Sequence, residues 1–226
     1  MKLTILPTFI KKYITKPSVN LNSQGFRPME FRKNDSIEGA KSFAMQTFRI
    51  KQLSASQLYE YNEINRICTK IYNLTEGRAL FPKEIVMKTY KKPQRYQGEY
   101  QDNKVSLIKQ NTYLSTLIHE IGHYNHELMS RNFIKMGKKS EIKADMLNPD
   151  YSIYERFSRD SQNLKAIKFY LGGYATSSPS EFIAEMFMAV INGRRLPQGM
   201  FGLYKLYEGP HADILYKQYQ KLNLFL

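Results

Sequence analysis

The apolar pattern between residues 111 and 131 is the feature that most constrains the fold of this chain. Apolar residues recur there at three- and four-residue spacing, namely Leu114, Leu117, Ile118, Ile121 and Leu128. This spacing predicts an amphipathic helix, and no other segment of the chain has a better helical pattern. The helix is expected to begin at about Asn111 or Thr112, a residue type that caps helices, and to end near Arg131.

Two histidines lie four residues apart in the middle of this helix, in the sequence His119-Glu120-Ile121-Gly122-His123. Four residues is slightly more than one helical turn, so both imidazoles project from one face and can bind a single zinc ion. Glu120 lies about 100° around the helix from His119, where it can act as general base toward a water in the open position of the zinc. Apolar neighbours place the histidines at the edge of a core. The motif therefore predicts a zinc-dependent hydrolase.

A catalytic zinc site needs a third protein ligand. His126 lies on the same side of the helix, but three ligands in a row along one straight helix suit a tetrahedral ion poorly. The metzincin arrangement also fails, because His126 and Met129 stand where it requires glycine and histidine. Glu181 and Glu185 share one face of a later helix, and a carboxylate among apolar residues, as Glu185 is, normally needs a partner. Spacing favours one of these two glutamates as the ligand without choosing between them.

A longer pattern joins Leu117-Ile118-His119-Glu120-Ile121-Gly122-His123 to Tyr174-Ala175-Thr176-Ser177-Ser178-Pro179-Ser180-Glu181-Phe182-Ile183-Ala184-Glu185. In it, HExxH is followed by a tyrosine that stands seven residues before the first glutamate of an E-[FY]-x-A-E sequence. The pattern resembles the anthrax lethal factor-like zincins, which include the catalytic domain of lethal factor and the secreted Pro-Pro endopeptidases. The resemblance covers residues 104 to about 195.

The resemblance implies a role for each matching residue. His119, His123 and Glu181 would bind one Zn²⁺, and Glu120 would be the general base. Tyr174 would donate a hydrogen bond to the oxyanion of the tetrahedral intermediate. Glu185 would steady a liganding histidine or the helix that carries Glu181.

The resemblance also implies a fold and a substrate class. The expected fold is α+β and zincin-like, with a small mixed sheet packed on the HExxH helix and a C-terminal helical subdomain, over residues 51–226. The expected activity is that of a metalloendopeptidase acting on a peptide or protein. The strand Lys104 to Ile108 would be the edge strand, to which an extended peptide adds as a further strand.

Other elements follow from periodicity and capping residues. A helix is expected from Ser54 as N-cap to Gly77, a strand at 84–90, and a polar loop at 91–103. Further helices are expected near 154–171, from Ser178 to Asn192, and over 211–222.

Residues 1–50 read as an irregular, extended basic arm, because Pro7, Pro17 and Pro28 interrupt it and no helical period persists. Residues 1–51 hold ten Lys or Arg and three acidic residues, a net charge of +7 out of +14 for the chain. Such an arm is either a solvated basic surface or a contact for an acidic partner, neighbouring subunits or nucleic acid. It supports an alternative function, a zincin-fold structural component of a large assembly such as a phage particle, with or without peptidase activity.

The sequence predicts neither a signal peptide nor a membrane span. Pro7 and Lys11-Lys12 interrupt the short apolar start, and no stretch approaches the roughly 18 apolar residues of a spanning helix. Cys68, the single cysteine, cannot form an internal disulfide and is expected to be a small buried residue. These features favour synthesis in the cytoplasm, and they leave open incorporation in a phage particle or export by a non-classical route.

Overall fold

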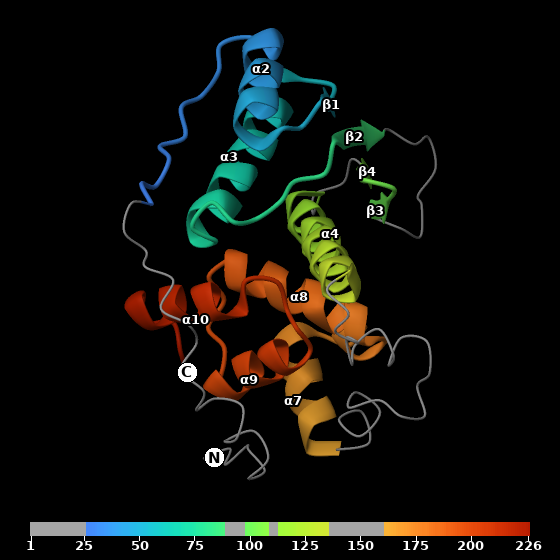
Figure 1. Cartoon of the computed structure of the whole chain (residues 1–226), viewed down its shortest axis with the longest axis vertical. Coiled ribbons are helices and arrows are strands. Elements are labelled where there is room, and N and C mark those ends of the chain that lie inside the picture. The colour runs from blue at the N-terminus through green and yellow to red at the C-terminus, as the bar shows by residue number, and fades with distance from the viewer. Residues whose placement is uncertain (1–25, 89–97, 109–112, 136–160) are drawn as a thin grey trace. The chain divides into compact units, whose positions relative to one another are not determined.

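The computed structural model describes residues 26–88, 98–108, 113–135 and 161–226 (Figure 1). By their contacts these residues form two compact units, one within Arg27–Asn125 and one that comprises Phe26 and the described residues from His126 to Leu226. A small mixed sheet and several helices make up the described chain, which confirms the α+β class.

The sheet of the first unit has four strands in the order β1-β2-β4-β3. Strands β1 (Gln52–Ser54), β2 (Glu84–Lys88) and β4 (Lys104–Ile108) run parallel, and β3 (Gly98–Gln101) is antiparallel to β4. Strand β4 was expected at the edge, and this is wrong, because β4 lies between β2 and β3. The edge strands are β1 and β3, and β3, which pairs with β4, lies within the segment 91–103 expected to be a loop.

Alternation within the strands shows which face of the sheet is covered. Ile85 and Met87 of β2 and Val105 and Leu107 of β4 are buried, whereas their neighbours in sequence are half-buried. This period of two is the signature of a sheet with one face on the core. The opposite face carries charge, including the Lys104–Glu84 ion pair at 3.4 Å.

Helices α2 (Ile37–Phe48) and α3 (Leu58–Leu74) lie side by side in this unit (Figure 1). Helix α2 occupies residues that were expected to belong to the irregular arm, so that expectation is wrong for 37–48. Its buried residues are Ala40, Ala44 and Phe48, and small alanines four apart allow α3 to approach closely. Residues 1–25 of the predicted arm lie outside the described residues.

Asparagines on α3 hold the segment that precedes α2. Asn73 donates to the carbonyl of Met29 and accepts from its N–H, both at 2.8 Å. Asn62 does the same for the backbone of Asn34, at 3.0 and 2.8 Å. Each side-chain amide thus pairs with the N–H and the C=O of one residue, as a residue of a neighbouring antiparallel strand would. The described part of the expected arm is therefore attached to its own unit.

Helix α3 confirms the predicted helix, but its N-cap is Gln57 and not Ser54, which ends β1. The Glu60 side chain accepts from the N–H groups of Ser56 and Gln57, at 2.8 and 3.0 Å. It thereby satisfies backbone donors that the first turn of a helix leaves without partners. This buried carboxylate is used in capping.

The second unit contains α7 (Ser161–Leu171), the short 3₁₀ helix η2 (Tyr174–Thr176), α8 (Pro179–Ile191), α9 (Gln198–Leu206) and α10 (Ala212–Lys221). Helix α8 is its most apolar element, with eight buried residues, and η2 and α7 pack against it. The predicted helices at 178–192 and 211–222 are confirmed, while α9 was not foreseen. Of the helix predicted near 154–171, residues 154–160 lie outside the described residues.

Within the described ranges, no helix is long and apolar enough to cross a membrane.

Candidate functional site

Helix α4 (Tyr113–Lys135) carries the histidine motif and confirms the helix predicted around it. At about 100° per residue, Leu117, Ile118 and Ile121 share one side of α4, and all three are at most 1% exposed. The other side of α4 carries, in angular order around the helix, His119, His123, Thr116, Glu120 and Tyr124. The apolar side fixes the rotation of the first half of α4, which belongs to the first unit, and thereby determines where the functional side chains point.

His119 and His123 point toward a common position. Their Nε2 atoms are 3.0 Å apart and their rings are nearly perpendicular, at 80°. His119 is 7% exposed and His123 is half-buried. Two ring nitrogens at this distance either share one proton or face a common ion. The predicted convergence of the two imidazoles is thus present in α4.

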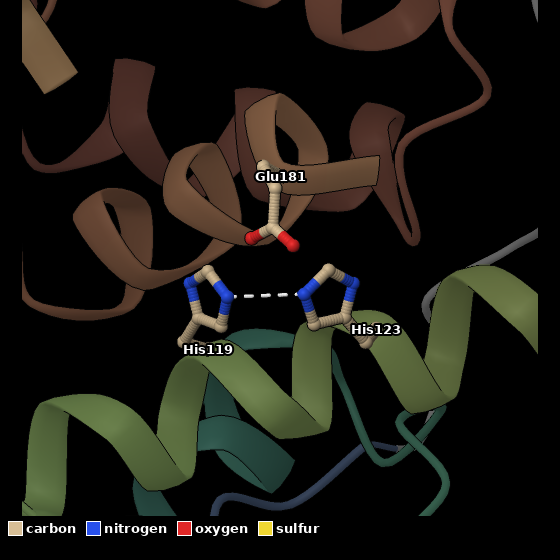
Figure 2. A group of neighbouring side chains, drawn as sticks. All are labelled: His119, His123 and Glu181. Carbon is tan, nitrogen blue, oxygen red and sulfur yellow. Dashed lines mark hydrogen bonds between the residues drawn. The ribbon is translucent and has the colours of Figure 1, made fainter. Parts of the chain in front are cut away.

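Glu181 belongs to the same group of side chains. One potential ligand atom from each of His119, His123 and Glu181 lies within 4.8 Å of the other two. Figure 2 shows both imidazoles on one side of their helix and the Glu181 carboxylate turned toward them. Two imidazole nitrogens and one carboxylate oxygen form a donor set found in catalytic zinc sites. The three residues therefore fit a zinc ion chemically, and the group includes neither His126 nor Glu185.

The first turn of α8 determines the position of Glu181. Ser178 is the N-cap, with extended backbone, and its Oγ accepts a hydrogen bond from the N–H of Glu181 at 3.1 Å. Pro179 occupies the first helical position, where its missing N–H costs nothing. Phe182, Ile183 and Ala184 are fully buried and anchor this turn. The predicted cap is thus also the element that holds Glu181 in place.

Glu185 and Tyr174 are both near Glu181 in the chain. Glu185 is half-buried, one turn further along α8. Tyr174 begins η2, and its carbonyl accepts hydrogen bonds from the N–H and the Oγ of Ser177, at 3.0 and 2.7 Å. Its side chain is 60% exposed, so the phenol is accessible.

Glu120 lies beside the edge strand. It is 7% exposed, and its neighbours include Gly98 of β3. A β-carbon at position 98 would stand 3.2 Å from Oε1 of Glu120 and 2.4 Å from Cγ2 of Thr116. Only glycine, which has no side chain, allows the strand this close to α4.

Sequence reasoning missed Gly98 and Thr116, because it treated residues 91–103 as a loop. The Asp102-Asn103 pair directly before β4 is the sequence signal that could have found the strand. In the structure both residues have positive φ angles, of 49° and 66°. Adjacent Asx residues with such angles form the two-residue turn that joins antiparallel strands. A strand ending at Gln101 would follow from that turn.

Asn125 secures the middle of α4 to a neighbouring loop. Its Nδ2 donates to the carbonyl of Leu80 at 2.8 Å, and its Oδ1 accepts from the N–H of Leu80 at 2.9 Å. A further bond joins Nδ2 to the carbonyl of Ile121 at 2.9 Å. Asn125 is 2% exposed and only two residues from His123. It therefore ties the histidine-bearing turn to the chain that leads into β2.

Comparison with known proteins leaves the site to be interpreted from its own chemistry. No protein-family model matches the chain, and no curated protein or solved structure matches it.

Proposed function

We propose that this protein is a zinc-dependent endopeptidase of the lethal factor-like zincin kind. The observation that carries the proposal is the grouping of His119, His123 and Glu181, with one potential ligand atom of each within 4.8 Å of the others. These two histidines also flank the glutamate that hydrolysis requires. Zinc bound there would supply a Lewis acid that polarises the scissile carbonyl and acidifies a water molecule.

The protein's own groups then have distinct tasks. The Glu120 carboxylate takes a proton from the attacking water and passes it to the leaving amine, as the C–N bond breaks and a C–O bond forms. The Tyr174 phenol donates a hydrogen bond to the oxyanion that develops on the carbonyl. Its exposure is compatible with reaching a substrate. Glu185 steadies a liganding histidine or the α8 turn that bears Glu181.

The peptide substrate pairs with β3 in this proposal. Strand β3 is one of the two edges of the described sheet, and its first residue, Gly98, lies against Glu120. An extended peptide hydrogen-bonded to the outer edge of β3 would therefore pass close to the general base. This replaces the earlier assignment of the substrate strand to β4, which is interior.

The alternative of a purely structural component receives no support from the described residues. It draws on the long basic arm, of which residues 1–25 lie outside the described residues. Residues 29 and 34 are held by α3, and residues 37–48 form a helix packed on it. The proposal therefore keeps hydrolysis as the function.

A cleavage assay with matched variants tests the proposal. Zinc-loaded wild type is incubated with a peptide library, and the products are identified by mass spectrometry. Glu120→Gln removes the base and keeps the size of the side chain, so we expect turnover to fall by at least about 10³-fold with zinc still bound. Glu127→Gln, on the same helix, is the matched control and should cleave like wild type. Undiminished cleavage by Glu120→Gln would refute the mechanism.

A further inference from the structure

The stripe of α4 that faces β3 consists of Thr116, Glu120 and Tyr124, each four residues from the next. Strand β3 meets this stripe at two points. Gly98 lies against Thr116 and Glu120, and the Tyr100 ring packs edge-on against the Tyr124 ring with centroids 5.4 Å apart. Residues 98 and 100 share one face of the strand, because side chains alternate. The two contacts together fix the separation of β3 from α4.

The first contact is the tighter and cannot accept another atom. A β-carbon at position 98 would lie 2.4 Å from Cγ2 of Thr116, which is closer than real carbon contacts. The methyl belongs to a short β-branched side chain, which has only two favoured χ1 angles on a helix, so few rotations of Thr116 could relieve the contact. The same β-carbon would lie 3.2 and 3.4 Å from Oε1 and Cγ of Glu120. Any added group would therefore displace the strand, the Thr116 side chain or the Glu120 carboxylate.

We infer that Gly98 is a positioning residue, whose bare backbone lets β3 support the Glu120 carboxylate in its working place. The strand closes one side of the space around this carboxylate, while Thr116 sets how near the strand can come. The inference rests on the proposed function for its catalytic consequence. The contact itself stands on the packing of β3 against α4.

The packing is tested on the metal-free chain by thermal unfolding. Gly98→Ala should lower Tm by roughly 3–10 °C through overpacking. Combining it with Thr116→Ala removes the clashing methyl, and the double variant should lose much less than the sum of the single variants. Combining it with Glu120→Ala should likewise recover part of the loss. Gly173→Ala is the control, because the one atom within 4 Å of its β-carbon beyond its chain neighbours is Cε of Lys168, at 4.0 Å.

The catalytic consequence is tested on the zinc-loaded chain. Gly98→Ala should lower kcat about tenfold or more, because displacements well under 1 Å already matter in a reacting site. Zinc affinity should stay within about twofold of wild type. Gly98→Ala with Thr116→Ala should recover much of kcat, whereas a general loss of folded protein would lower activity and zinc content together.

The outcomes separate the two claims. If wild type cleaves no peptide, the proposed function fails, and the Tm coupling of position 98 to Glu120 still decides the inference. If wild type cleaves and Gly98→Ala cleaves equally well, the inference alone fails. Strictly additive Tm losses for both pairs would also overturn it, whatever the activity.

Discussion

The Asn125 side chain offers the clearest quantitative test of how α4 is held. Its two bonds to the backbone of Leu80 and a third to Ile121 have lengths of 2.8–2.9 Å. A buried hydrogen bond contributes about 1 kcal/mol net. The Ile121 carbonyl also accepts the ordinary helical bond, so we count only the two bonds to Leu80. Asn125→Ala should therefore lower the free energy of unfolding by about 2 kcal/mol.

Urea unfolding followed by far-UV circular dichroism measures this loss. The control is Arg66→Ala, which breaks the exposed Arg66–Glu63 ion pair at 2.7 Å and should cost less than about 1 kcal/mol. Hydrogen exchange at the Leu80 amide should also accelerate in Asn125→Ala, since Asn125 is the acceptor of that N–H. A loss below about 0.5 kcal/mol, with Leu80 exchange unchanged, would refute the reasoning.

Two further predictions concern groups whose environment the structure defines. Burial raises the pKa of the Cys68 thiol. A disulfide reagent should therefore label Cys68 very slowly in the native chain, even near pH 8.5, where an exposed thiol is half ionised. Rapid labelling of the native chain would contradict the burial of Cys68. Ser178→Ala and Ser36→Ala each remove an N-cap bond, at 3.1 and 3.0 Å, and each should cost about 1 kcal/mol by chemical denaturation. Only Ser178→Ala should also weaken zinc binding, measured by calorimetry, because only Ser178 caps the turn that carries Glu181. Equal zinc affinities of the Ser178→Ala and Ser36→Ala variants would contradict that role.

The elements that sequence reasoning located are those with a strong apolar period or an unambiguous cap. Helix α4 has a complete apolar stripe, and α8 combines Ser178 at the N-cap with Pro179 at its first position. In both, local chemistry and burial favour the same structure. The two histidines could be placed on one face for the same reason, because helical geometry alone decides it.

The missed elements lack such a signal. Helix α2 buries mainly Ala40 and Ala44, which differ little from surface residues in a pattern of hydropathy. It is fixed by tertiary contacts, including the bond from Asn65 on α3 to the Ala40 carbonyl at 2.9 Å. Strand β3 is short and half-exposed, and it exists because β4 offers a partner. Long-range pairing of this kind leaves little trace in a local window.

The third member of the histidine group could not be chosen from spacing. Glu181 and Glu185 share one face of α8, and either could have faced the histidines. The group contains Glu181, in the first turn of α8, and does not contain Glu185. That choice depends on how segments distant in sequence come together, which periodicity does not encode.

Zinc-edge X-ray absorption on the purified protein, with metal stoichiometry from the same sample, tests the central claim most directly. We predict one zinc per chain, with two imidazole nitrogens and a carboxylate oxygen at about 2.0–2.2 Å. His123→Ala should abolish stoichiometric binding, and Glu181→Gln should weaken it at least tenfold while α4 and α8 stay folded. A wild type that binds no zinc, or a His123→Ala variant that binds it with unchanged affinity and ligation, would contradict the claim.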